Sequence, residues 1–487
     1  MNTVALQSDR IRPNQLAPTR SALLAALATV TATVTGAASS AEEIRVLYAA
    51  IDVGSLGGEV ERYWGINQNG DLTGSATLQP GDKINRVPFR WTASTGVMEG
   101  LRDQFGNIAG GWGVAINDAG TIVGTSGGIC TWTTDGVYTN LGVFGGESAL
   151  AVDINNRGQV LADVTFSDPP GRRTEAVLYT DGDYIVLPRL AYEGRSTPTA
   201  LNNNGIACGI SRAVDNITNP VAWKDGEVIA LPRLHPTGAG WAHDVNDHDV
   251  VAGYLSTNDP QWPGTAHAVL WTLDGDLIDL HAQHHQSGWT SSRAEKINNR
   301  GDVVGFANWP NSTRYNGKMF LYRDGAIIRG SEIEPPNMSV SLDRIYGFND
   351  DGWISVSGNE GPVNRRRIDR GQLLVPVTYS MSLGDPSSVK AGTETEIAIS
   401  NAEPNARVIL MWGIYGGGAP ILNCSLHENA LQILNPRFLG SVQTDALGAG
   451  TYRGVIPPDT AGREILIQAV HPPTCAVSNL VRFTIEE

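Results

Sequence analysis

The chain has 487 residues, a net charge of −15 and 17% charged side chains, where about 25% is typical of globular proteins. Glycine is abundant, with 56 residues, and there are 12 tryptophans. Few charges and many aromatic residues exclude a disordered chain, and this composition is typical of an all-β protein with many turns. The acidic balance argues against a nucleic-acid or anionic-membrane partner, because both recruit lysine and arginine.

Residues 1–41 have the organisation of a secretory signal peptide. A polar segment with three arginines precedes an uncharged, mildly apolar run over residues 21–35, and small residues follow as far as Ala41. We expect cleavage after Ala38 or Ala41, and a protein that is secreted, held at the cell surface or released into the periplasm. The alternative is a disordered tail. The run is too short and too rich in threonine for a membrane span, and no other segment predicts one.

A sequence repeat occupies the region that follows. An apolar residue and an asparagine precede a turn that ends in glycine, and a short β-type run comes next, as in residues 116–124. The asparagine recurs seven times, and these residues are Asn67, Asn117, Asn155, Asn202, Asn246, Asn298 and Asn349. Asparagine tolerates the left-handed conformation and its side chain can bond a nearby backbone N–H. We therefore predict that the seven asparagines are structural turns.

Each copy continues with an apolar strand that ends in an aromatic residue, a turn with glycine and a last strand, as in residues 221–231. About four strands per copy match one propeller blade, and seven copies can close into a ring that protects the strand edges. This predicts a seven-bladed β-propeller. Residues 46–53 resemble a last strand that closes the ring, but residues 372–376 resemble the seventh copy's own last strand. We predict an irregular seventh blade, with a partial eighth blade as the alternative.

The repeat resembles the extracellular HAF-type repeat of secreted and cell-surface bacterial proteins, which is named for a His-Ala-Phe strand. The corresponding strands here begin at His267, Glu175 and Pro220, and residues 48–58 are similar to the family's usual first segment. The resemblance covers residues 44–377. It implies a propeller-like repeat protein outside the cell, and it implies no particular activity, because the family has no established common one.

Residues 378–487 lack the asparagine turn and form a second predicted domain. About seven runs alternate apolar and polar residues, which is typical of half-buried strands and predicts an immunoglobulin-like β-sandwich. Cys424 and Cys475 lie in this domain, and the export signal favours a disulfide between them. Cys130 and Cys208 lie in propeller strands two copies apart, and we predict that they are small buried residues.

The sequence contains no established nucleophile, nucleotide or zinc motif, and it predicts no cofactor. His281, His284 and His285 follow Asp279 at close spacing, but this is not a recognised metal pattern. We predict a solvated loop there, with the three histidines as weak metal candidates only. Several carboxylates lie in the propeller region outside any motif, namely Asp52, Glu59, Glu147 and Glu193.

Five tryptophans lie near the predicted blade connections, and these are Trp64, Trp112, Trp241, Trp289 and Trp309. Each could stack on a sugar at a ring face, although filling a gap between blades is the preferred interpretation of any single one. The sequence favours a binding or scaffold protein that recognises a glycan or protein ligand on a propeller face, rather than an enzyme. The alternative is a carbohydrate-active hydrolase or lyase, which would need paired carboxylates in the propeller channel.

Overall fold

The computed structural model describes residues 47–486 apart from a set of short segments. The segments that lie outside the description are 52, 59–60, 83, 169–170, 192–193, 213–216, 259–264, 285–287, 309–316, 334–339, 361–367, 378, 403, 415, 421–429, 434–435, 446–447, 457–459 and 472–475. The predicted signal peptide and the predicted disulfide between Cys424 and Cys475 fall outside the described residues as well.

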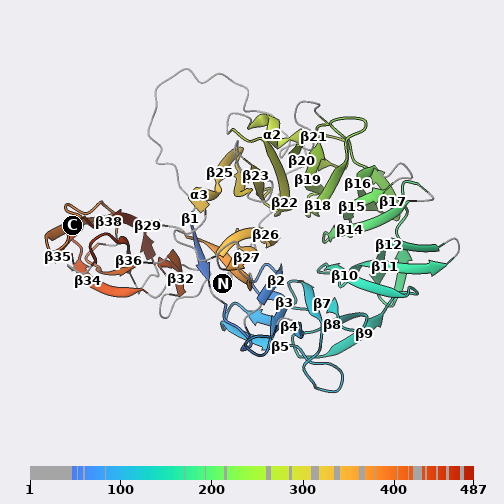
Figure 1. Ribbon diagram of the computed structural model, residues 1–487, viewed down its shortest axis with the longest axis horizontal. Coiled ribbons are helices and arrows are strands. Elements are labelled where there is room, and N and C mark those ends of the chain that lie inside the picture. The colour runs from blue at the N-terminus through green and yellow to red at the C-terminus, as the bar shows by residue number, and fades with distance from the viewer. Residues whose placement is uncertain are drawn as a thin grey trace, which may run out of the picture. The chain divides into compact units, whose positions relative to one another are not determined.

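Seven antiparallel sheets surround a common axis, and the first strand of each sheet lies nearest to it (Figure 1). Six of these sheets are four-stranded meanders of consecutive strands. The first three consist of β2 (Glu61–Ile66), β3 (Leu72–Thr77), β4 (Arg86–Thr92) and β5 (Val97–Gly100); β6 (Trp112–Ile116), β7 (Ile122–Thr125), β8 (Ile129–Trp132) and β9 (Tyr138–Gly142); and β10 (Ser148–Ile154), β11 (Val160–Asp168), β12 (Gly171–Thr180) and β13 (Asp183–Val186).

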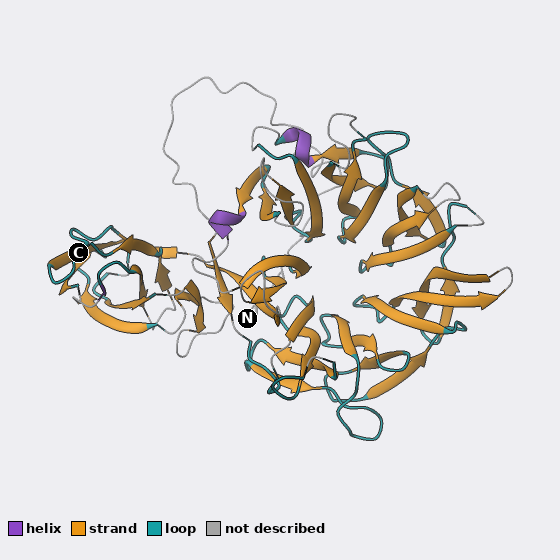
Figure 2. Cartoon of the chain, in the orientation of Figure 1, coloured by secondary structure: helices purple, strands orange, loops and turns teal. Residues whose placement is uncertain are grey.

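The next three sheets have the same order, and a short helix follows each of the last two (Figure 2). They consist of β14 (Arg195–Leu201), β15 (Ala207–Arg212), β16 (Thr218–Lys224) and β17 (Glu227–Ala230); β18 (Gly240–Val245), β19 (Val250–Ser256), β20 (Ala266–Thr272) and β21 (Leu277–Asp279); and β22 (Ser291–Ile297), β23 (Val303–Asn308), β24 (Lys318–Arg323) and β25 (Ala326–Arg329). Helix α2 (Leu280–Gln283) follows β21, and α3 (Gly330–Ile333) follows β25. None of the described helices is long and apolar enough to cross a membrane.

The seventh sheet closes the ring with a strand from the other end of the propeller sequence. β26 (Val340–Phe348), β27 (Ile354–Glu360) and β28 (Ile368–Val377) are its first three strands, and β1 (Leu47–Ile51) pairs antiparallel with β28 as the fourth. The predicted all-β class and seven-bladed propeller are confirmed. Residues 372–376 are part of the third strand, so the prediction that they form the last one is wrong. The described strands contain no eighth blade.

An aromatic residue recurs near the end of the third strand in the first six blades, and it is buried in five of them. Trp132, Trp223 and Trp271 are each at most 1% exposed. Their indole Nε1 groups donate to carbonyl oxygens in the connections that enter their own blades, over 2.7 to 2.8 Å. A buried indole N–H usually has a hydrogen-bond partner, and in these three blades the connection supplies one.

Cys130 and Cys208 are buried and free, as predicted. Each lies on a strand within a blade and is completely shielded from solvent. Burial raises the pKa of both thiols to about 12, so neither is a reactive thiolate at neutral pH. They act as small apolar side chains in the packing of the propeller.

The strands after residue 378 form a separate sheet. It consists of β29 (Tyr379–Leu383), β30 (Glu394–Ser400), β31 (Arg407–Gly413), β34 (Arg437–Gln443), β35 (Gly450–Val455), β36 (Glu464–His471), β37 (Ala476–Ser478) and β38 (Val481–Thr484). Its two end strands, β34 and β35, lie in contact, so the sheet nearly closes on itself. The predicted immunoglobulin-like sandwich would consist of two sheets packed face to face, and this strand pairing does not establish it. Two further strands, β32 (Gly416–Pro420) and β33 (Ala430–Ile433), extend the seventh blade's sheet beyond β1.

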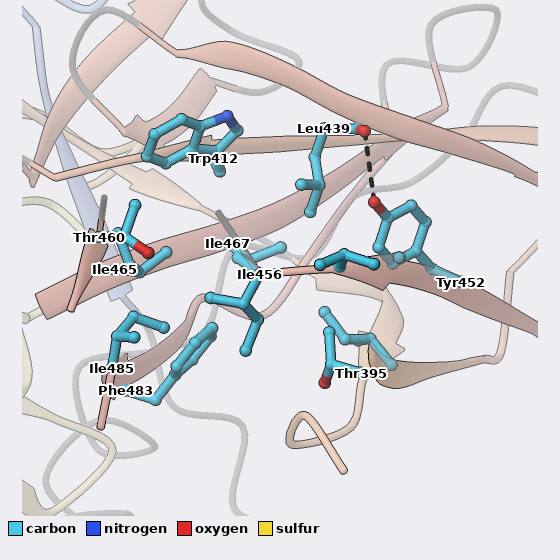
Figure 3. Close-up of a pocket in the computed structure, with 13 residues that line it drawn as sticks. Thr395, Trp412, Leu439, Tyr452, Ile456, Thr460, Ile465, Ile467, Phe483 and Ile485 are labelled. Carbon is cyan, nitrogen blue, oxygen red and sulfur yellow. Dashed lines mark hydrogen bonds between the residues drawn. The ribbon is translucent and has the colours of Figure 1, made fainter. Parts of the chain in front are cut away.

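The interior of the C-terminal sheet contains a small apolar cavity of about 40 Å³ (Figure 3). Trp412, Ile467 and Phe483 are among the side chains around it, and Tyr452 Oη donates to Leu439 O at its edge over 3.4 Å. Its lining is mainly apolar, and a void of this size is too small for an organic ligand. This cavity is therefore part of the core.

Candidate functional site

All seven repeat asparagines lie in the turn between the first and second strands of a blade. They are 1 to 7% exposed. In every turn the asparagine Oδ1 accepts a hydrogen bond from the backbone N–H four residues later, over 2.8 to 3.0 Å. The side chain thus satisfies a buried donor that the tight turn would otherwise leave unpaired.

The same side chains join the blades to one another. Each asparagine Nδ2 donates to the backbone carbonyl of the corresponding asparagine in the next blade, over 2.9 to 3.2 Å. The bond from Asn349 to Asn67 closes the circle. We call these seven residues the asparagine ring. It links all seven blades at one end of the axis.

A second closed ring lies beside the first. The residue after each ring asparagine donates its backbone N–H to the side-chain oxygen of its counterpart in the next blade, over 2.7 to 2.9 Å. These residues are Gln68, Asp118, Asn156, Asn203, Asp247, Asn299 and Asp350. The turn interpretation of the sequence missed this ring, although all seven side chains carry a carbonyl or carboxylate oxygen.

A cavity of about 170 Å³ opens on the axis at this end of the propeller. Turn residues from all seven blades line it, together with Asp153 and Asp244. The acidic groups here are engaged in structural bonds, as Asp118 and Asp350 in the second ring show. No group of three or more potential metal ligands occurs among the described residues. The asparagine end is thus built for closure of the ring.

The rest of the axis is lined by the first strands, whose side chains alternate regularly. Counting back from each ring asparagine, the fourth residue is buried in all seven blades, whereas the third and fifth are at least partly exposed in all seven. A register shift in the pairing falls between the fourth and second of these positions in every blade. The third and fifth residues therefore face the axis.

Aromatic and charged side chains are concentrated at these axis-facing positions. We call the following set the axis ring: Arg62, Trp64, Trp112, Trp241, His243, Arg293, Glu295, Arg344 and Tyr346. The Trp64 ring lies 6.1 Å from that of Trp112 and 6.5 Å from that of Tyr346, measured between centroids. Further round, the Trp241 and His243 rings are 6.4 Å apart. Five of the seven blades contribute to this set, which lies away from the asparagine turns.

The predicted tryptophans divide into two groups. Trp64, Trp112 and Trp241 belong to the axis ring and are half-buried. Trp289 is 6% exposed and packs 4.8 Å from Phe320, so it fills the core. Trp309 lies outside the described residues. His243 and Tyr346 were missed, although their distance from the ring asparagine is the same as that of Trp64.

Two carboxylates and one amine lie between the axis ring and the asparagine ring. Asp153 accepts backbone hydrogen bonds from Ile154 and Leu201, both over 2.8 Å. Asp244 accepts from the backbone of Ile297 over 2.9 Å, and Lys296 Nζ lies 3.4 Å from its other oxygen. Burial raises the pKa of Asp153 to about 6, against the opposing charge of Lys296. Every one of the four carboxylate oxygens already accepts a bond within the protein, so the pair is arranged to hold adjacent blades together.

Asp163 on β11 is a half-buried acid without such support. Its Oδ1 has no hydrogen-bond partner among the described residues. At the equivalent interface one blade earlier, Thr125 accepts the backbone N–H of Ala151 over 3.1 Å. The strand that faces Asp163 has Pro198 at this position, and proline has no N–H to donate. Burial accordingly raises the pKa of Asp163 from 3.8 to about 6.

Replacing Asp163 with asparagine is expected to raise the free energy of unfolding by about 1–2 kcal/mol at about pH 7.5. The pKa rise corresponds to about 3 kcal/mol, and partial exposure of the side chain reduces it. Because the folded pKa lies above the unfolded one, the cost of the carboxylate builds up between about pH 4 and 6, so the gain should vanish below about pH 4. Urea unfolding at both pH values measures it. Asp181→Asn, at an exposed turn, should change little, and an equal gain at both pH values would contradict this account.

The histidines near Asp279 are part of the packing between the fifth and sixth blades. His281 is 7% exposed in α2, its Nδ1 lies 2.8 Å from Ser292 Oγ, and its ring stacks 4.0 Å from that of His267. His267 Nδ1 in turn lies 2.8 Å from an Asp279 oxygen. The solvated loop predicted here is wrong for His281, because the short helix turns this side chain inward. His284 packs against an aromatic ring, and His285 lies outside the described residues.

No family model and no curated protein sequence matches this chain. Among solved structures, it is similar to a gluconolactonase from Xanthomonas campestris, with a TM-score of 0.33 and 11% identity over 68% of this chain and 97% of that one. It is also similar to a trypsin-activated α2-macroglobulin from Escherichia coli, with a TM-score of 0.16 and 8% identity over 91% of this chain and 43% of that one. Structural similarity with TM-scores this low supports no statement about activity.

Proposed function

We propose that this protein binds a glycan through the axis ring. Trp64, Trp112 and Tyr346 come from three consecutive blades around the closed ring and form one aromatic group. Sugar rings have apolar C–H faces and hydroxyl edges, and half-buried aromatic side chains next to polar groups suit both. Arg62, Glu295 and the other charged members of the axis ring supply those polar groups. This grouping of aromatic side chains at axis-facing positions of neighbouring blades is the observation that carries the proposal. A protein ligand is the second candidate for the same surface.

The channel carboxylates support binding more than hydrolysis. A glycosidase needs two carboxylates free to act on substrate, as acid and as base or nucleophile. Asp153 and Asp244 share the channel, but their oxygens accept backbone hydrogen bonds or an ion pair from neighbouring blades. A hydrolase or lyase that uses this pair would have to break the contacts that hold the blades in place.

The proposed setting is outside the cell. The signal-like sequence of residues 1–41 and the resemblance of residues 44–377 to the HAF-type repeat both support export. We also propose that residues 378–487 form an immunoglobulin-like module. The first strand of that region, β29, pairs antiparallel with β30 and parallel with β37, and such a strand shared between two groups of strands supports this assignment.

Replacing Trp64 or Trp112 with alanine is expected to weaken glycan binding about tenfold or more, because each substitution removes one wall of the aromatic group. A glycan array probed with the wild-type protein would first identify ligands. Titration calorimetry with the best ligand would then measure the loss in each variant.

Phe438→Ala is the matched control, since it removes an aromatic side chain that is 61% exposed but lies in the C-terminal sheet. It should bind as the wild type does. An array without signal, or tryptophan variants that bind normally, would rule out the axis ring as a glycan site. A parallel screen with chromogenic glycosides tests the enzyme alternative. If the protein hydrolyses one of them through the channel carboxylates, Asp153→Asn should abolish that hydrolysis.

A further inference from the structure

The outer edge of the third blade is an apolar strand whose outer side pairs with no described strand, although the Tyr184 ring stacks on that of Phe144 at 5.6 Å. β13 pairs with β12 on one side and with no other described strand. All four of its residues are exposed, and Tyr184, Ile185 and Val186 are 43%, 51% and 45% exposed. Such an edge offers unpaired backbone groups to another strand. In the seventh blade, the corresponding edge of β1 is taken by β32.

β13 differs in this respect from the equivalent strands of the other blades. Each of β5, β9, β17, β21 and β25 has at least two residues that are partly buried. None of these five strands presents three consecutive exposed apolar side chains. Natural edge strands are usually protected by charges, bulges or short length, and the three apolar residues of β13 that follow Asp183 have only the short length of the strand.

The end of β13 is basic. Arg173 Nε and Arg189 Nη1 lie 3.0 and 3.1 Å from the same oxygen of Glu175, which is 1% exposed. Two guanidinium groups therefore share one carboxylate, and the group carries a net positive charge. Val186 lines the same recess, whose volume is about 320 Å³. The buried glutamate fixes both arginines at the place where the strand ends.

The beginning of β13 is acidic. Asp183 is its first residue, and Asp181 lies in the turn just before it. Both side chains are exposed. The strand thus runs from an acidic end to a basic end, with apolar side chains between them.

We propose that two copies of this chain pair through β13 in antiparallel orientation about a twofold axis. This pairing sets Asp183 of one copy opposite Val186 of the second copy, beside its arginine recess, and the symmetry repeats the contact at the other end. Tyr184 of each copy then lies opposite Ile185 of the other. A surface that is complementary to itself is what a twofold interface requires, and it joins two blades into one eight-stranded sheet. A four-residue strand buries less area than a stable dimer needs, so we expect weak association that is detectable only at high protein concentration.

Sedimentation velocity of the full chain from low micromolar to several hundred micromolar protein tests this proposal. The average mass should rise from 51.9 kDa towards twice that value, and less so at high salt, because the end contacts are ionic. Hydrogen exchange at high protein concentration should slow at the β13 amides and leave the other outer strands unchanged.

Ile185→Lys should abolish association, because it places a charge in the apolar middle of the edge, opposite Tyr184 of the other copy, and the twofold symmetry repeats it. Ala230→Lys is the matched control, since Ala230 is the exposed last residue of β17 in the next blade, and it should associate as the wild type does. Asp183→Lys should weaken association by reversing the charge that faces the recess. A chain that stays monomeric at every concentration would overturn the proposal. So would a monomer whose β13 edge pairs with a strand of a different protein. An Ile185→Lys variant that still associates normally would overturn it too.

Discussion

Asn246→Ala is expected to lower the free energy of unfolding by about 3–5 kcal/mol. The Asn246 Oδ1 accepts the backbone N–H groups of His248 and Val250, and its Nδ2 donates to the carbonyl of Asn298 in the next blade, all within 3.1 Å. The residue is 3% exposed, so water cannot replace these bonds without opening the turn. Each buried group left without a partner costs about 1–3 kcal/mol. Urea unfolding followed by circular dichroism measures the loss.

Two further variants separate the turn from the link between blades. His248→Ala changes an exposed residue of the same turn and should cost less than about 0.5 kcal/mol. Asn246→Asp keeps the acceptor for the turn but loses the donor to Asn298 and buries a charge. A protonated carboxyl can donate again, so the folded pKa of this aspartate should be raised and stability should recover as the pH falls. An aspartate variant as stable as the wild type at neutral pH would show that the bond between blades contributes nothing.

The propeller could be predicted because its repeat consists of residues with local roles. The ring asparagine fixes a turn, and the aromatic residue of the third strand fills the gap between blades, so both recur at regular spacing. The closed rings could be foreseen only in part. A side-chain oxygen follows every ring asparagine, which indicates an acceptor, but its partner lies 38 to 52 residues away within the ring and 282 residues away at the closure.

The candidate site was harder to predict because tryptophans alone do not reveal their surroundings. Trp289 and Trp64 look alike in the sequence, but Trp289 lies in the connection after α2, where it is covered by Phe320. Distance from the ring asparagine separates them, since only residues three or five positions before it face the axis. The same count identifies His243 and Tyr346. The register shift in each first strand decides this orientation, and no single residue type marks it.

The C-terminal region shows a different limit. Alternation correctly indicated strands such as β30, whose residues are exposed and buried in turn. The pairing of these strands could not be predicted, because β29 pairs with strands near both ends of the region, and one of them is distant in the sequence. The seventh blade presents the same difficulty, because its fourth strand comes from residues 47–51, more than three hundred residues before the third.

Removing β1 is therefore expected to have the largest effect of any change considered. A chain that begins at Gly54 loses Tyr48 and Ile51, which are 0% and 4% exposed, together with the pairing along β28. Burial of these two side chains alone contributes about 5 kcal/mol, which is close to the whole stability of many domains. The ring should then fail to close, and the thermal transition should become broad and move to lower temperature. Calorimetry and dye binding to exposed apolar surface would record this.

A chain that begins at Arg45 is the matched control, because it lacks the preceding segment but retains β1 and should unfold like the full chain. Hydrogen exchange adds the decisive detail. If β1 acts as the closing strand, its loss should increase exchange first in β26–β28 and β2, on either side of the opened closure, and least in the fourth blade opposite. Uniform exchange in all blades, or a chain without β1 that unfolds at the same temperature as the control, would show that the asparagine ring closes the propeller without the strand.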